Sequence, residues 1–141
     1  MAIMEPRVYQ WMYARLTGDA QVMAVFGTRV YRKVIPQAAS YPPSLVMQYM
    51  GGGTLAVING IRIWSDMLFM IKATGTNGQY TNLRNGMDRV DALLHRATGS
   101  VTGAQIIWCE QVNEVPIEPV VYSGETYEQI AVMYRVKAHA A

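Results

Sequence analysis

The sequence predicts an α+β fold: an antiparallel sheet of about four strands with helices packed on one face, built by residues 1–141 as a single domain. Three observations support this fold class. Apolar and polar residues alternate along 61–74 and 125–138, as in strands that bury one face. Apolar residues recur at helical spacing along 80–97. Helical segments come first, then strands, a helix and two more strands, an order that favours an antiparallel sheet.

Two short helices are expected over residues 6–26. Pro6 suits a first helical turn, and Gly18 suits the stop of the first helix. Asp19 can cap the second helix, which Gly27 ends. The 28–43 connection that follows holds three prolines, so it cannot form a long helix.

Strands are expected at 44–50 and 61–74, joined by a hairpin whose turn is the Asn59-Gly60 dipeptide. In the second strand one face holds Ile61, Ile63, Met67, Phe69 and Ile71, interrupted only by Ser65. The other face holds Arg62, Asp66 and Lys72 together with Trp64, Leu68 and Met70. This second face is apolar enough that we expect something to cover it.

The amphipathic helix expected at 80–97 places Leu83, Met87, Val90, Leu94 and Ala97 in one stripe. Gly86 costs it about 1 kcal/mol relative to alanine. Two closing strands are expected at about 104–113 and at 125–138, where Ile130, Val132, Tyr134 and Val136 alternate with polar residues.

Three consecutive glycines, Gly51, Gly52 and Gly53, raise the question of a phosphate-binding loop. Such a loop leads into a helix and ends in lysine with serine or threonine. Here the glycines run into β-branched residues and a hairpin signal, without a lysine. They are interpreted instead as the mobile end of a hairpin over 51–60.

No catalytic or metal-binding pattern is present, so we predict that the protein is not an enzyme and uses no cofactor. His95 and His139 lie far apart in sequence, and no spacing typical of zinc ligands occurs. The single cysteine, Cys109, lies in a strand pattern, where free cysteines are mostly buried. Asp88 and Asp91 share a helix face with basic groups, as on a solvated surface.

The composition excludes some classes of protein. A net charge of +2, without dense lysine and arginine clusters, does not indicate an obligate nucleic-acid binder. Arg29, Arg32 and Lys33 do surround Tyr31, a pattern that suits either a single nucleic-acid strand or an interface rim. The longest apolar run, 67–71, is too short to cross a bilayer. Charged residues make up only 16%, so the ten Met, nine Tyr and three Trp either face a partner or fill one core.

The segment "VFGTRVYRKVIPQAASYPPSLVMQYMGGG" resembles the signature region of tailed-phage tail completion or tail terminator proteins. It contains an R-V-Y at Arg29–Tyr31 and a P-Q-A-A at Pro36–Ala39. Proline then leads into an apolar strand that ends in an aromatic residue, Leu45–Tyr49. The remaining elements follow in the family's order, although only 26–50 is specific. Tyr41-Pro42-Pro43 and the triple glycine depart from the family's pattern.

The resemblance implies a structural virion protein at the head–tail junction, assembled in the host cytoplasm. It would form a ring, in this family usually a hexamer, that caps the tail tube and contacts head-side neck proteins. Genomic DNA would pass through the lumen without specific binding, and no membrane is involved. The alternatives are a head-completion or adaptor protein that binds the portal, a nucleic-acid-binding module, and a small enzyme.

Loops over 28–43 and 51–60 are expected to supply the contacts with other proteins, because binding residues concentrate on loops held by a rigid sheet. Tyr31 and Trp64 could equally be core residues. The predicted interface residues are Arg29, Tyr31, Arg32, Tyr49, Gly51, Gly52, Gly53, Asn59 and Trp64.

Overall fold

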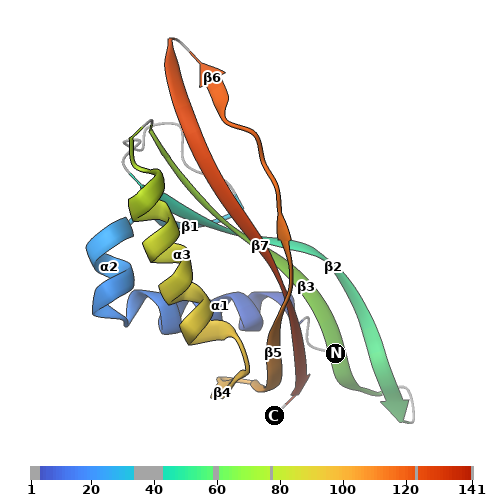
Figure 1. The fold of residues 1–141 in the computed structure, drawn as a ribbon. Coiled ribbons are helices and arrows are strands. Elements are labelled where there is room, and N and C mark those ends of the chain that lie inside the picture. Colours follow the sequence, from blue (N-terminus) through green and yellow to red (C-terminus); the bar gives the residue numbers. More distant parts are fainter. Residues whose placement is uncertain (1–3, 34–42, 59–60, 77, 123, 141) are drawn as a thin grey trace.

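The computed structural model describes residues 4–33, 43–58, 61–76, 78–122 and 124–140. Within these residues there are three helices: α1 (Glu5–Thr17), α2 (Ala20–Phe26) and α3 (Tyr80–Leu94). The strands are β1 (Val30–Arg32), β2 (Ser44–Ile58), β3 (Ile61–Thr76), β4 (Ala97–Val101), β5 (Ala104–Val115), β6 (Val120–Tyr122) and β7 (Glu125–Ala140). All three helices lie on one side of a twisted sheet (Figure 1).

The sheet is larger than predicted and is not purely antiparallel. Its seven strands run in the order β1-β2-β3-β7-β5-β4, with β6 beside β7. β1 is parallel to β2, and the other pairs are antiparallel. The expectation of about four antiparallel strands was therefore wrong, whereas the mixed helix and strand content and the one-sided helices are confirmed. The unpredicted strands β1, β4 and β6 have only three to five residues, too few to show a clear alternation.

The core lies between the helices and one face of the sheet. The alternation predicted for β3 is confirmed, because Met67, Phe69 and Ile71 are buried and the residues between them are half-buried. The apolar stripe of α3 is also buried, although this helix ends at Leu94 and not at residue 97. Arg96 takes a positive φ of 63°, which turns the chain directly into β4.

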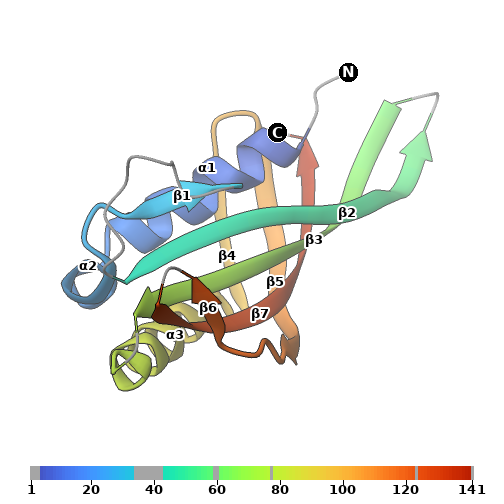
Figure 2. The ribbon, with the colours of Figure 1, turned by 90° about the horizontal axis from the view of Figure 1, so that it is seen from above.

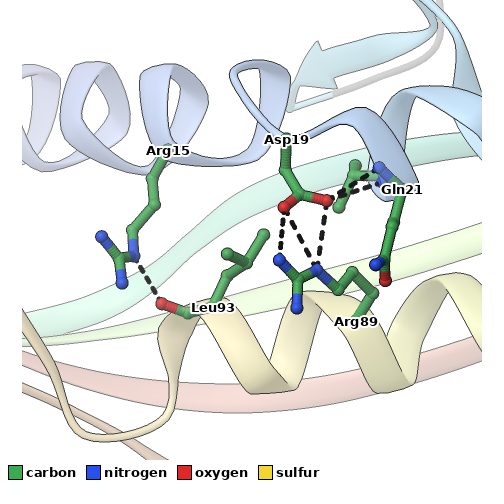
Figure 3. Close-up of polar contacts among 6 residues, drawn as sticks. Arg15, Asp19, Gln21, Arg89 and Leu93 are labelled. Atoms are coloured by element: carbon green, nitrogen blue, oxygen red, sulfur yellow. Dashed lines mark hydrogen bonds and ion pairs between the residues drawn. The ribbon is translucent and has the colours of Figure 1, made fainter.

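The helices are joined by polar contacts at their ends (Figure 3). Asp19 caps α2 as predicted, since its Oδ1 accepts hydrogen bonds from the N–H groups of Gln21 and Val22, both 3.0 Å. The same carboxylate forms an ion pair with Arg89 of α3, with an Nη2–Oδ2 distance of 2.6 Å. Arg15 of α1 donates to the carbonyl oxygen of Leu93, also on α3.

Close packing explains the glycine inside α3. A Cβ added at Gly86 would lie 2.6 Å from the Phe26 ring of α2, which is too close for any real contact. The absence of a side chain at Gly86 therefore lets α2 pack against α3, at the cost of a less favourable helix propensity. Nothing in the helical periodicity of the sequence indicates this contact.

Strands β2 and β3 form a hairpin much longer than predicted. They pair from Ser44 with Thr74 to Ile58 with Ile61, which confirms the hairpin; Asn59 and Gly60 lie outside the described residues. Figure 2 shows the far part of this hairpin reaching beyond α1 and the end of β7. The three glycines lie inside β2, so the expectation of a loop over 51–60 was wrong for residues 51–58. Glycine has low strand propensity, but here the neighbouring β3 holds the chain in register.

Candidate protein-interaction surface

The three glycines bring β2 close to β3 at an irregular point of the sheet. Met50 has no partner in the register, which shifts between Tyr49 and Gly51. Gly51 has a φ of 120°, a conformation that other residues rarely adopt. A Cβ at Gly52 would lie 2.4 Å from the carbonyl oxygen of Asp66, whereas a Cβ at Gly53 would have open space around it. Gly52 is therefore required by close packing and Gly53 is not.

Hollows lie on both faces of the sheet at the glycines, because glycine has no side chain to fill them. On the face away from the helices, a hollow of about 380 Å³ is lined by the glycines, Met50, Asp66, Leu68 and Arg135, among others. On the helix side, a hollow of about 190 Å³ lies beside the start of α1. Ser65 lines this second hollow, and its buried hydroxyl has no hydrogen-bond partner within the described ranges.

The face of the sheet away from the helices is named here the open face. Its apolar members include Met50, which is 46% exposed, and Trp64, which is 38% exposed. Leu68 and Met70 are half-buried beside them. No helix within the described part of the chain lies on this side of the sheet (Figure 1). The sequence correctly shows an apolar second face, and its expected cover is not found within the described chain.

Charged groups on the open face are paired across strands. Arg135 of β7 lies 3.6 Å from Asp66 of β3, measured from Nε to Oδ1. Lys137 is the register partner of Asp66, and Glu110 is that of Arg135. The Trp64 ring lies 5.9 Å from the His139 ring, centroid to centroid. The open face thus combines exposed apolar groups with partly neutralised charges, a composition that suits contact with protein.

Two predicted interface residues, Tyr31 and Trp64, lie toward the open face. Trp64 alternates with the buried Ser65 and Met67 along β3. Tyr31 is half-buried and pairs with Val46, next to the core residues Val30 and Leu45. Neither residue is part of the core cluster, so the alternative that both fill the core is not supported.

Three others, Arg29, Arg32 and Tyr49, are engaged inside the molecule. The Arg29 Nε donates to the carbonyl oxygen of Pro43 at 2.9 Å. Arg32 pairs with Glu5 at 3.0 Å. Tyr49 packs against Phe69 with ring centroids 5.4 Å apart. Asn59 lies outside the described residues. The structure therefore gives these three side chains contacts within the subunit, and their predicted role in contacts between proteins remains a prediction.

Tyr9 connects α1 to the helix side of the sheet through several contacts. Its ring meets Phe69 edge-on at 5.1 Å, and the guanidinium of Arg32 lies 4.3 Å above it. Its hydroxyl accepts a hydrogen bond from the N–H of Tyr49 at 2.5 Å. Burial raises the pKa of the Tyr9 hydroxyl, which therefore stays protonated. Sequence reasoning missed this residue, because helical spacing identifies a buried position but not what it contacts.

A second exposed apolar feature, also missed, lies at the other end of the molecule. Val120 and Val121 of β6 are 47% and 69% exposed, and β6 with the start of β7 reaches away from the helices (Figure 1). The signal for it is the apolar pair that follows Pro119. This pair was not singled out because a strand of three residues shows no alternation.

In the described part of the chain, the groups with potential chemistry are buried or held in hydrogen bonds. Cys109 is buried in the core, and burial raises the pKa of its thiol to about 12. His95 is exposed, and its Nδ1 accepts a hydrogen bond from the N–H of Gln111 at 3.0 Å. Asp91 accepts a hydrogen bond from the Tyr134 hydroxyl at 2.9 Å. Across the described ranges, no three histidine, cysteine or acidic side chains are grouped to hold a metal ion. Within the same ranges, no helix is both long and apolar enough to span a membrane.

The fold and surface thus define an α+β protein whose distinctive features are a long hairpin and an exposed apolar sheet face. A family model described as "Tail completion protein gp17" matches residues 10–135, and the chain belongs to this family. A comparison with curated proteins finds no match.

Among solved structures, the chain resembles one described as "Virion of native gene transfer agent (GTA) particle". The two share 14% identity, with a TM-score of 0.72 over 99% of each chain. Another solved chain has a TM-score of 0.49 at 13% identity, over 94% of this chain and 89% of its own length. At such identities the first likeness concerns the fold alone.

Proposed function

We propose that this protein is a structural component of a phage or phage-like virion that completes the tail and joins it to the head-side neck. The observation that carries the proposal is the match of residues 10–135 to the tail completion family. A solved chain of the same fold comes from a structure described as the virion of a gene transfer agent particle, which agrees with the proposal. A structural role also agrees with the exposed apolar face, since exposed apolar patches mark interaction sites.

The protein acts as an oligomeric ring, with six subunits as the expected number. A ring of identical subunits needs two different patches on each subunit, which meet by rotation around a closed circle. The β2–β3 hairpin supplies one such patch, and the open face is left for contact with tail or neck proteins. The partners are other copies of the chain, the tail tube protein and the neck proteins on the head side, and genomic DNA passes through the lumen without specific binding. The site of action is the head–tail junction.

The experiment that tests the proposed function is complementation of a particle that lacks this protein. Wild-type protein should restore tailed, infectious particles, and native mass spectrometry of the purified assembly should give a sixfold mass. Purified tail tube and purified portal-side neck protein are offered separately as partners. Binding to the portal side alone would favour a head-completion or adaptor protein.

Two matched substitutions show whether the open face takes part. Met50 on the open face and Tyr13 on α1 are exposed to nearly the same extent, 46% and 47%. Met50→Lys should abolish particle formation while the melting temperature stays close to the wild-type value. Tyr13→Lys should leave particle formation intact. Normal particles from Met50→Lys would remove the open face from the proposal.

A further inference from the structure

Strand β2 has an outer edge that is covered at its start and uncovered along the rest of its length. β1 pairs with it only from Leu45 to Met47. Backbone bonds continue this cover, from the N–H of Leu45 to the carbonyl of Arg29 and from the N–H of Lys33 to the carbonyl of Met47, both 2.9 Å. Next along this edge, the Tyr9 hydroxyl accepts a hydrogen bond from the N–H of Tyr49. From Met50 to Ile58, no strand in the described part of the chain pairs with this edge.

The uncovered edge lacks two common protections against strand pairing. The segment "MGGGTLAVI" contains no charged residue and no proline, two of the devices by which proteins keep exposed edges from pairing. The register shifts after Tyr49 and Thr54 bend the strand. The bent part belongs to the hairpin that reaches beyond the body of the subunit (Figure 2), where another chain can approach it.

The opposite end of the same sheet offers a second uncharged edge. β4 is the last strand in the order and pairs only with β5 in the described structure. Its sequence, "ATGSV", is also free of charge and proline. By contrast, the part of β5 that extends past β4 contains Glu110 and Glu114. The two ends of the sheet therefore match each other in chemistry.

We infer that the outer edge of β2, from Met50 to Ile58, pairs with β4 of a second copy of this chain, so that one sheet continues from subunit to subunit. This inference rests on the proposed ring and names its contact. Pairing through two different edges is a heterologous contact, the type that generates a ring when the rotation closes. Addition of a strand satisfies backbone groups that would otherwise bond to water, and the side chains of both strands continue the faces of the sheet.

The face to which each edge residue belongs supports pairing of β2 with β4 of a second copy, here called the join. Gly53 pairs with Asp66, and Ser100 pairs with Gln105, which in turn pairs with His139 beside Trp64. Gly53 and Ser100 therefore belong to the same face of the sheet. On the other face of β4, Trp11 of α1 packs close to Gly99. The helix layer and the open face would both continue across the join.

Hydrogen exchange measured by mass spectrometry is the first test, with the full chain as monomer and as assembled ring. Amide exchange in 50–58 and in 97–101 should slow at least tenfold on assembly, while exchange in the exposed N-terminal turn of α3 stays unchanged. Unchanged exchange in either edge segment would overturn the inference.

Disulfide cross-linking between two differently labelled copies is the second test. One copy carries Gly53→Cys, Leu55→Cys or Val57→Cys, and the other carries Thr98→Cys or Ser100→Cys, so that the panel spans the possible registers. Cys109 is buried with a raised thiol pKa and should not react. At least one mixed pair should cross-link, whereas each variant alone should not. Self-linking of a β2 variant would show a symmetric dimer edge and overturn the inference.

The outcomes separate this inference from the proposed function. If rings form and tails are completed without protection or cross-links at these edges, the tail role stands and the edge contact is wrong. If the edges cross-link but complementation fails, the contact stands and the tail role is wrong. A protein that stays monomeric with tails present contradicts both.

Discussion

Asp19 and Arg89 join the second helix to the third through a two-pronged ion pair. The Arg89 Nε lies 3.1 Å from both carboxylate oxygens of Asp19, and Nη2 lies 2.6 Å from Oδ2. Because the same carboxylate caps α2, one side chain fixes both the start of that helix and its position against α3 (Figure 3). Hydrogen bonding to Arg89 is the main cause that lowers the pKa of Asp19 from 3.8 to about 2.

This pKa shift predicts a pH dependence of stability. A carboxyl group with a lowered pKa in the folded state stabilises the fold above its unfolded pKa and loses that effect as the pH falls through the folded value. The free energy of unfolding of wild type should therefore exceed that of Asp19→Asn at neutral pH. The difference should shrink between about pH 4 and about pH 2. Urea titrations across this pH range measure the difference in the free energy of unfolding. Asparagine is a suitable replacement because it can still cap the helix.

A double-mutant cycle provides the control for the ion pair. In an Arg89→Met background, Asp19→Asn should have a much smaller effect, and its pH dependence should weaken. An equally large pH-dependent effect in that background would mean that the helix cap, and not Arg89, sets the pKa of Asp19.

Alanine at Gly86 should destabilise the protein although alanine favours helix. The added Cβ would lie 2.6 Å from the buried Phe26 ring. Overpacking of this kind costs about 1–3 kcal/mol, against a propensity gain of about 1 kcal/mol. Thermal and urea unfolding should show a net loss. Asn85→Ala, on the exposed face of the same helix, is the matched control and should be neutral or stabilising. Equal stabilisation by both changes would show that α2 moves away freely.

Neighbouring glycines of β2 should respond differently to the same substitution. Gly52→Ala places a Cβ 2.4 Å from a backbone oxygen of β3 and should cost about 1–3 kcal/mol in unfolding free energy. Gly53→Ala enters open space and should change stability by less than about 0.5 kcal/mol. Chemical denaturation of both variants measures the two changes in unfolding free energy. Similar values for the two would contradict the close approach of the strands.

Removal of the Tyr9 hydroxyl should weaken the protection of the Tyr49 amide, which lies where the uncovered part of the β2 edge begins. Tyr9→Phe keeps the ring against Phe69 but removes the acceptor for the N–H of Tyr49. The loss of one such bond costs about 0.5–1.5 kcal/mol. Hydrogen exchange by NMR should speed up at the Tyr49 amide, with little change at Leu45, whose N–H bonds to Arg29. Unchanged exchange at Tyr49 would mean that water replaces the hydroxyl without cost.

Much of the fold follows from local pattern. The periods of β3, β7 and α3 correctly identified their buried faces, because burial on one side imposes the alternation directly. The Asp19 cap and the β2–β3 hairpin also followed from short-range chemistry. The number of strands could not be predicted from the sequence, because β1, β4 and β6 form through pairing with longer strands and not through their own composition.

The candidate surface was predicted only in part. Trp64 was predicted because Arg, Tyr and Trp are common at interface hot spots, and the structure leaves it exposed. Arg32 looks equally suitable in sequence, yet it lies over Tyr9 and pairs with Glu5. Contacts of this kind join residues far apart in the chain, so no local pattern reveals them. The glycines suggested a loop because the sequence does not show that β3 lies beside them.

At Gly51–Gly53 the surface presents peptide groups, and not side chains, to a neighbouring molecule. Peptide groups are common to every sequence, so recognition there would survive extensive replacement of residues elsewhere. One methyl group at residue 52 would already disturb this surface, because its carbon would lie 2.4 Å from the carbonyl oxygen of Asp66 on the neighbouring strand.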